Sequence, residues 1–402
     1  MRILFLTPQL PFPPRQGTAI RNWGLISHLA ERHEISLLSF AEAGQPGASP
    51  ELQAACRQVV TVPVPRRTRL ARLRTLFSPQ PDMARRLWSP DFADALAGVL
   101  GACAFDFVHV EGIELAPYLP AILRRAEGGR RPLAFYDAHN AEYLLQQRAF
   151  LSDRRRPARW PAALYSLVQV PRLRRFEADT CRAADRVACV SKEDVAVLRG
   201  LVPGLRPVLV PNGIDVAAYT AGVEQPAHGA SPYLVFTGKM DYRPNVDAAL
   251  WFAREIFPLI RERRPDVQFF IVGQKPVEPL RQLDGRGGVV VTGLVEDARP
   301  YIAAAAAYVA PLRMGGGTRF KLLEAMALSR PIVSTRLGAE GFEVRSGREL
   351  LLADAPAEFA EAALTLLEQP SRARALAVAG RAFVRAGYDW SVIIPRLEAA
   401  YG

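Results

Sequence analysis

Short apolar runs and longer amphipathic stretches alternate along the whole chain of 402 residues. The apolar runs are rich in Val, Ile, Leu and Phe and show no strict alternation, which is typical of parallel strands covered by helices on both faces. The expected strands of the first half are 2–7, 34–40, 105–110, 133–137, 186–191 and 208–211. Those of the second half are 233–238, 267–273, 289–293, 307–312, 331–335 and 350–353. The pattern predicts an α/β protein built on parallel sheets.

The chain is too long for one ordinary hydrophobic core, so two domains are expected. Between the halves lies "AAYTAGVEQPAHGASPY" (217–233), which is polar, rich in Gly, Pro and Ala, and typical of a linker. We predict two Rossmann-like, doubly wound domains, 1–212 and 213–385, that face each other across a cleft. The closing helix, 386–402, is expected to pack back on the first domain.

A run with three successive glycines separates an expected strand from a helical pattern, in "APLRMGGGTRFKLLEAMALSRPIVST" (310–335). Three glycines indicate a close backbone approach or positive φ angles. A helix N-terminus carries partial positive charge, so the cations Arg319 and Lys321 in the first turn oppose the usual preference. A bound anion, most simply a phosphate, would resolve this conflict. The alternative interpretation is a left-handed turn followed by two solvated cations.

Two further residues of the second half extend this candidate site. Lys239 directly follows the apolar run "YLVFTG", and with Arg319, Lys321 and the amides of 315–318 it could bind a diphosphate. Glu324 lies five residues after Arg319 on a mostly apolar helix and could accept hydrogen bonds from a ribose. The alternative for Glu324 is a solvated glutamate on the helix.

Several familiar motifs are missing from the sequence. No GxGxxG follows the first strand, no GxxxxGK[ST] or GxSxG is present, and no two Asp are separated by one residue. The last absence removes the usual chelating motif of metal-dependent sugar transferases. The four cysteines form no CxxC pair, and no apolar run reaches the length of a membrane span. "MRILFLTPQLPFPP" is interpreted as a strand and its loop, so a cytoplasmic protein is expected.

The net charge of +11 is unevenly distributed, with arginine-rich segments at 66–86 and 151–175. No nucleic-acid partner is expected, because no recognition helix, zinc finger or aromatic RNA-binding pattern is present. The second segment interleaves cations with aromatic and aliphatic residues, which suits an anionic membrane surface. The residues predicted for this surface are Arg154, Arg155, Arg156, Arg159 and Trp160. The alternative is a solvated arginine-rich helix.

Three segments carry a family resemblance: "VPNGID", "GKMDYRPNVDAALWF" and "GGGTRFKLLEAMALSRPIVST". They resemble the donor half of the GT-B, family 4 retaining glycosyltransferases. The resemblance is greatest to the sugar transferases associated with exosortase/PEP-CTERM exopolysaccharide systems, and it extends over nearly the whole chain. It implies hexosyl transfer from a nucleotide-sugar donor to a glycan acceptor, with a polyprenyl-diphosphate-linked glycan as the expected form. It implies no metal and no cofactor. Peripheral association with the inner face of the plasma membrane is expected from the basic segment 151–175.

The resemblance also implies roles for single residues. Glu324 would hold the donor ribose, and Lys239, Arg319 and Lys321 would bind the diphosphate. His139, in "YDAHNAEY", would face the donor sugar. The remaining residues expected at the donor are Gly17, Asn212, Gly238, Gly315, Gly316, Gly317 and Thr318.

The sequence departs from the family pattern at two positions. Gly316 stands where a glutamate is frequent, and Pro244 stands near the place of a usual lysine, so Arg243, Arg319 or Lys321 must supply that charge. Neither the base nor the sugar of the donor is predicted. We expect front-side attack, in which the leaving phosphate receives the acceptor proton and His139 orients the donor sugar. The alternative for His139 is a hydrogen-bonded histidine at a strand end.

Two other functional classes fit the same architecture. A non-hydrolysing nucleotide-sugar epimerase would need acid and base residues around the sugar and would leave the basic segment 151–175 unexplained. A non-catalytic nucleotide-sugar sensor would keep the fold without turnover.

Overall fold

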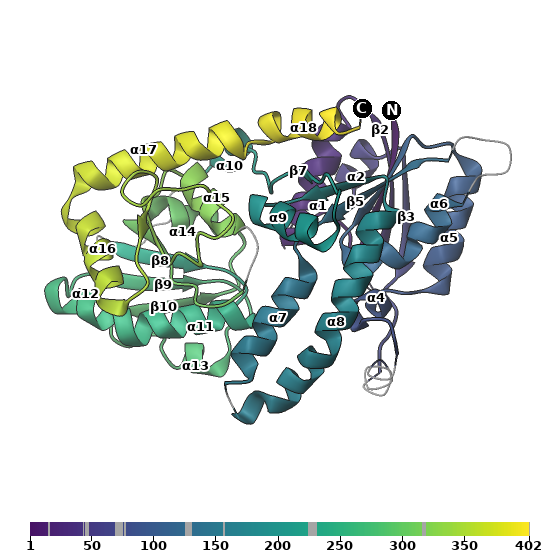
Figure 1. Cartoon of the computed structure of the whole chain (residues 1–402). Helices are drawn as coiled ribbons and strands as arrows, with labels where there is room; N and C mark the ends of the chain where they lie inside the picture. Colours follow the sequence, from purple (N-terminus) through teal and green to yellow (C-terminus); the bar gives the residue numbers. More distant parts are fainter. Residues whose placement is uncertain are drawn as a thin grey trace. The chain divides into compact units, whose positions relative to one another are not determined.

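The computed structural model describes the chain except residues 15–16, 43, 45–47, 69–74, 76–77, 125–130, 156, 224–230, 316–318 and 402. The chain divides into two compact units. The first comprises Met1–Pro211 with Ile394–Gly402, and the second comprises Asn212–Ile393. Each unit contains one parallel sheet with helices on both sides (Figure 1), so the expected pair of Rossmann-like domains is confirmed.

The sheet of the first unit has seven strands in the order β3-β2-β1-β4-β5-β6-β7. Their bounds are β1 Arg2–Thr7, β2 Glu34–Ala41, β3 Gln58–Pro63, β4 Phe107–Glu111, β5 Leu133–Ala138, β6 Arg186–Cys189 and β7 Val208–Leu209. Every pair in this sheet is parallel. The order reverses between β1 and β4, and ligands of doubly wound sheets bind beside such a point, at the carboxyl ends of the strands.

The described helices of the first unit follow the strands in alternation. They are α1 Gly17–Leu29, α2 Pro50–Ala55, α4 Asp82–Arg86, α5 Pro90–Ala102, α6 Leu119–Leu123, α7 Glu142–Asp153, α8 Trp160–Ala183 and α9 Lys192–Leu201. Local signals set their starts: Ser191, for example, accepts a hydrogen bond from the backbone of Asp194 at the beginning of α9. The carboxylate of Glu177 in α8 accepts the backbone N–H groups of Glu142 and Tyr143, which joins α8 to the first turn of α7.

The second unit has a six-stranded sheet in the order β10-β9-β8-β11-β12-β13. Its strands are β8 Tyr233–Thr237, β9 Gln268–Val272, β10 Val289–Gly293, β11 Ala307–Ala310, β12 Ile332–Ser334 and β13 Leu351–Leu352. Its described helices are α10 Val216–Thr220, α11 Arg243–Trp251, α12 Phe257–Arg263, α13 Glu278–Arg281, α14 Arg299–Ala304, α15 Phe320–Ala327, α16 Pro356–Glu368 and α17 Pro370–Gly387. Two separate apolar clusters pack against this sheet, one with α11, α12 and α16 and one with α10, α14 and α15.

Two elements differ from the expectation. Strand β3 is absent from the predicted list, because it lies at the sheet edge with only one buried residue, and its sequence "QVVTVP" gives no continuous apolar run. Helix α10 lies inside the segment interpreted as a linker, where Asp215 caps its first turn by accepting from the backbone of Ala218. The linker interpretation is therefore wrong for residues 217–220.

The final helix, α18 (Trp390–Ala399), begins in the second unit, and residues from Ile394 onward belong to the first. Its start explains the glycine of "VPNGID". A Cβ on Gly213 would lie 2.6 Å from Cδ2 of Trp390, so only glycine leaves room for that ring. The backbone N–H of Ile214 donates to the carbonyl of Tyr388 at 2.9 Å, which joins this segment to the approach to α18.

Candidate functional site

In both sheets, predicted site residues lie at the carboxyl ends of strands. Lys239 follows β8 and Arg319 follows β11, the two strands between which the order of the second sheet reverses, whereas His139 follows β5, the neighbour of β4 in the first sheet. Such positions bring loops of neighbouring parallel strands to one edge of the sheet. Gly17 is the first residue of α1, and Asn212, which is buried, is the first residue of the second unit.

Lys321 lies against the carboxyl end of β8. Its Nζ donates to the carbonyl oxygen of Thr237 at 3.0 Å and to Oδ1 of Asn245 at 2.8 Å. It also lies 4.2 Å from the centroid of the Phe236 ring, in a cation–π contact. Burial first, and then the charge of Arg319, lower the pKa of Lys321 to about 7. Its ammonium is therefore held at the strand end rather than on the outer surface of α15.

Gly238 and Lys239 form the turn above this ammonium. Gly238 has φ +151°, and a Cβ there would lie 2.6 Å from Nδ2 of Asn245 and 3.2 Å from Nζ of Lys321. Only glycine permits so close an approach. The Lys239 side chain is 42 % exposed and lies 3.6 Å from Asp241. The structure thus brings Gly238 and Lys321 together, while Lys239 is paired on the outside of the turn.

Arg319 occupies the N-cap position of α15. Its guanidinium lies beside Gly315, because a Cβ on that glycine would be 3.1 Å from Nη2 of Arg319. Gly315 has φ +100°, as the triple-glycine run predicts for a left-handed turn. Gly316, Gly317 and Thr318 lie outside the described residues.

Glu324 has a partner that the sequence did not indicate. The hydroxyl of Tyr219, on α10, hydrogen-bonds to the Glu324 carboxylate. Burial raises the pKa of Glu324, and this hydrogen bond and the charge of Lys321 act against the rise. Tyr219 lies in the segment interpreted as a linker, so no signal marked it as a site residue.

In the first unit, His139 ends a chain of buried hydrogen bonds. Its Nε2 lies 3.1 Å from Oε2 of Glu111, whose Oε1 lies 3.3 Å from Nδ1 of His109. Nε2 of His109 lies 2.8 Å from the hydroxyl of Tyr401, in the last turn of the chain. Burial alone would raise the pKa of Glu111, but the hydrogen bonds from His109 and His139 outweigh it and lower the pKa to about 2. Glu111 is therefore a carboxylate, which accepts an N–H from His139.

A second buried pair lies next to this chain. Arg21, from α1, donates through Nε and Nη2 to the two carboxylate oxygens of Asp137, both at 2.9 Å. Potential ligand atoms of Glu111, Asp137 and His139 lie within 4.8 Å of one another, a spacing that could hold a metal ion. However, Arg21 engages both oxygens of Asp137, and its positive charge opposes a cation there. We infer that these residues form a buried ion-pair network.

The sequence analysis missed Glu111, Arg21 and Asp137. The available signal was a glutamate that ends the otherwise apolar run "FVHVEG", directly opposite Asp137 in the register of β4 with β5. The order of the strands, which places Glu111 beside His139, is not visible in the chain order alone.

The first half of helix α8 presents an inverted pattern. Its buried residues are small or polar, namely Ala163, Ser166 and Gln169, whereas Leu173 is the buried apolar residue further along the helix. Its outer face carries Trp160, Leu164 and Leu167, whose exposed fractions are 62 %, 64 % and 52 %. A helix normally buries its apolar face, so this exposed apolar stripe lacks a partner within the described residues.

Cations surround the turn between α7 and α8, which run side by side (Figure 1). Arg154, Arg155 and Arg159 are exposed there, and Arg156 lies outside the described residues. Among the described helices, none is long and apolar enough to cross a membrane.

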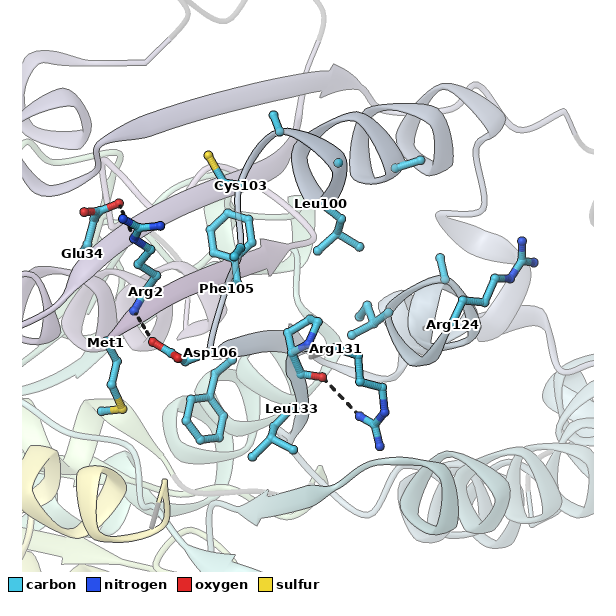
Figure 2. Close-up of a pocket in the computed structure, with 18 of the residues that line it drawn as sticks. Met1, Arg2, Glu34, Leu100, Cys103, Phe105, Asp106, Arg124, Arg131 and Leu133 are labelled. Atoms are coloured by element: carbon cyan, nitrogen blue, oxygen red, sulfur yellow. Dashed lines mark hydrogen bonds and ion pairs between the residues drawn. The ribbon is translucent and has the colours of Figure 1, made fainter. Parts of the chain in front are cut away.

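A cavity of about 1310 Å³ lies at the opposite, amino-terminal edge of the first sheet. Figure 2 shows Arg2 there, paired with Glu34 and, through its backbone, with Asp106. Arg131, on the same wall, pairs with Asp185 at 2.6 Å. None of the predicted site residues is among the described residues that line this cavity.

Two family models match the chain, one in each half. Residues 16–218 match the model described as "Glycosyltransferase Family 4". Residues 231–369 match the model described as "Glycosyl transferases group 1".

Curated relatives match part of the chain. The phosphatidyl-myo-inositol mannosyltransferase of Mycobacterium tuberculosis is 31 % identical over 211 residues, which are 49 % of this chain and 54 % of that protein. The enzyme of the same name from Propionibacterium freudenreichii is 27 % identical over 259 residues, 63 % of this chain and 65 % of that protein. The chain spans about half the length of the mycobacterial relatives that it matches.

Experimental structures of similar proteins cover nearly the whole chain. Sucrose-phosphate synthase from Thermosynechococcus elongatus superposes with a TM-score of 0.71 at 17 % identity, covering 100 % of this chain and 98 % of that one. The Anabaena protein HepE, in complex with UDP and glucose, gives a TM-score of 0.66 at 15 % identity, covering 99 % and 98 %. At these identities the likeness shows the fold.

Proposed function

Because the chain belongs to glycosyltransferase family 4, we propose that it is a retaining transferase acting in exopolysaccharide synthesis. Its two doubly wound sheets and the structural neighbours show the GT-B fold, and the two family matches support glycosyltransferase activity. In the proposal, the enzyme moves a hexosyl group from a nucleoside-diphosphate sugar to a lipid-linked glycan. The proposed role matches that of the transferases associated with exosortase/PEP-CTERM systems, which the sequence motifs of this chain resemble.

The observation that carries the proposal is the convergence of cations at the carboxyl ends of β8 and β11. Lys321 and Arg319 lie at the first turn of α15, beside the glycine turns at Gly238 and Gly315. Fixed cations and helix-end amides stabilise the negative charge that a leaving diphosphate develops. The related fold of HepE was determined with UDP and glucose, which supports a nucleotide-sugar donor.

The proposed reaction needs positioning and charge stabilisation rather than a divalent metal. The acceptor oxygen attacks the anomeric carbon from the face that the diphosphate leaves. A bond forms between that oxygen and the anomeric carbon, the bond from the anomeric carbon to the diphosphate oxygen breaks, and the acceptor proton passes to this oxygen. His139, anchored by the Glu111 carboxylate, orients the donor sugar, and Glu324 with Tyr219 binds the ribose.

The proposed acceptor is presented at the cytoplasmic face of an anionic membrane. The mycobacterial relative is named for mannosyl transfer to phosphatidyl-myo-inositol, an anionic lipid, which supports a lipid acceptor. The outer face of α8 supports membrane contact, because Trp160 and Leu164 are exposed there. They lie beside the exposed arginines of the turn in the α7–α8 hairpin, which are Arg154, Arg155 and Arg159. The proposed binding is peripheral.

A donor panel tests the function. The protein is incubated with UDP-, GDP-, ADP- and dTDP-sugars and a polyprenyl-diphosphate-linked glycan, and products are separated by mass spectrometry. The proposal expects a lengthened lipid-linked glycan that keeps the anomeric configuration of the donor. An epimerised nucleotide sugar, or binding without turnover across the panel, would assign the chain to a different function.

A further inference from the structure

We propose that Asn245 is a positioning residue that ties the two donor-side loops together and fixes the Lys321 ammonium for diphosphate binding. The proposal rests on the donor site of the proposed function. It adds a residue that is not a candidate ligand itself and acts through Lys321.

Asn245 joins two segments that are 76 residues apart in the chain. Its Oδ1 accepts from Nζ of Lys321 at 2.8 Å, and its Nδ2 donates to the backbone carbonyl of Lys239 at 3.0 Å. The first bond reaches the first turn of α15, which follows the loop after β11, and the second closes the turn after β8. One buried side chain therefore connects "PNVDA" with "GGGTRFK".

The two partners require an amide at this position. Lys321 can only donate and the Lys239 carbonyl can only accept, so the side chain must offer one acceptor and one donor. A carboxylate would keep the first bond and lose the second. Gly238 completes the arrangement, because any Cβ there would lie 2.6 Å from Nδ2 of Asn245 and force the amide away.

The geometry leaves Lys321 at most one donor for a ligand. An ammonium has three N–H groups, two acceptors, Thr237 and Asn245, meet Nζ among the described residues, and the Phe236 ring lies 4.2 Å from Nζ. A bound phosphate would accept the third N–H and stabilise the charged form. Diphosphate binding near neutral pH is then coupled to proton uptake by Lys321, since burial and Arg319 lower its pKa to about 7.

Two charged groups, Arg319 and Glu324, act directly on this ammonium. Tyr219 on α10, Asp297 before α14 and Tyr308 on β11 interact with Glu324, and Lys239 after β8 pairs with Asp241. None of them is changed in Asn245 variants, so a shifted pH dependence in such a variant reports the Asn245–Lys321 contact.

Calorimetry of nucleoside diphosphate binding between pH 5.5 and 9 tests the inference, with UDP, GDP and ADP as probes. In the unaltered protein, affinity should fall about tenfold per pH unit above pH 7, the dependence expected for one proton taken up. Asn245→Asp should move the midpoint of this fall upward by about one pH unit, because a carboxylate stabilises the Lys321 charge. Asn245→Ala should move it downward and weaken binding about tenfold at pH 7.5.

Two controls separate the possible outcomes. Gln282→Glu adds the same charge at the exposed C-cap position of α13 and should leave the midpoint unchanged. Lys321→Met should remove this fall of affinity with pH altogether, because the titrating ammonium is gone. If both Asn245 variants keep the midpoint and only lower thermal stability, Asn245 is a structural residue and the inference is wrong. If the unaltered protein binds none of the nucleoside diphosphates at any pH, the proposed donor site itself fails.

Discussion

The hydroxyl of Tyr401 lies 2.8 Å from Nε2 of His109, and this contact links the end of the chain to His139. His109 stacks between the rings of Phe5 and Phe135, with centroid distances of 4.4 and 4.3 Å. Because the ring is fully buried and bonded at both nitrogens, it cannot turn without breaking a hydrogen bond. Tyr401 thus helps to fix the carboxylate that holds His139.

We therefore expect Tyr401→Phe to lower kcat three- to tenfold while the donor KM changes less than twofold. The loss leaves Nε2 of His109 unpaired in a buried site, which loosens Glu111 and hence His139. Steady-state kinetics with the identified donor measure both constants. Glu398→Gln serves as the control, because it weakens the attachment of α18 to His33 without touching His109. An unchanged kcat in Tyr401→Phe would show that the hydrogen bond between Tyr401 and His109 does not affect His139.

The Glu111 carboxylate should give the first unit a pH-dependent stability. Its pKa of about 2 lies below the ordinary value of 4.5, so its stabilising contribution is present above pH 4.5 and is lost as the pH falls toward 2. Glu111→Gln removes this contribution. The difference in free energy of unfolding between the two proteins should shrink by about 2 kcal/mol from pH 4.5 to pH 3, at about 1.4 kcal/mol per pH unit. Hydrogen exchange of the β4 and β5 amides in urea measures the unfolding free energy of the first unit alone. If the difference in this free energy between the unaltered protein and Glu111→Gln does not change with pH, the prediction is wrong.

The long parallel strands and the glycine turn could be predicted from local sequence, because a fully covered strand is apolar throughout and Gly315 has a positive φ. The contacts within the site could not. Glu111 meets His139 only because β4 lies next to β5, and Asn245 meets Lys321 only because the loops after β8 and β11 share one sheet edge. Such juxtapositions arise from strand order rather than from local pattern.

The segment of α10 shows a different limit. Its small residues and neighbouring Gly and Pro are typical of a linker, yet its aromatic residue Tyr219 packs toward α15 and bonds to Glu324. A five-residue helix is too short to give a periodic pattern, so tertiary packing determines it.

This contact leads to a prediction about the nucleoside. Glu324→Gln should weaken UDP or GDP binding about tenfold or more, the value of a charge-assisted hydrogen bond, and should leave inorganic pyrophosphate affinity unchanged. Tyr219→Phe should give a smaller loss of the same kind, because it removes only the group that orients the carboxylate. Titration calorimetry with both ligands measures the pattern. Equal losses for the nucleotide and for pyrophosphate would place Glu324 at the phosphates instead.

Metal dependence can be tested directly. Since the proposed charge stabilisation comes from Lys321, Arg319 and backbone amides, transfer should continue at more than half its rate in excess EDTA. The assay compares initial rates before and after chelation, and after addition of Mg²⁺ or Mn²⁺. Loss of turnover in EDTA that either ion restores would instead assign a metal to the site, with Glu111, Asp137 and His139 as the described residues suitably spaced to hold it.

The hairpin of α7 and α8 gives the last prediction, on membrane binding. Flotation with phosphatidylglycerol-containing vesicles should recover the protein, less at high salt and not with neutral lipid alone, because each basic residue near an anionic surface contributes about 1 kcal/mol. Changing Arg154, Arg155 and Arg159 to Ser should weaken binding by about two orders of magnitude. The double change Leu164→Ser and Leu167→Ser should weaken it through lost insertion, with little change in salt dependence.

A matched control is available in the second unit. Leu294 is 77 % exposed and belongs to the second unit, so Leu294→Ser removes an exposed leucine outside the α7–α8 hairpin segment and should leave flotation unchanged. All variants should retain nucleoside diphosphate affinity, since the hairpin belongs to the first unit and the diphosphate residues belong to the second. If the arginine and leucine variants still float with anionic vesicles, the outer face of α8 binds another partner, and the inverted pattern of this helix must be explained by a protein surface.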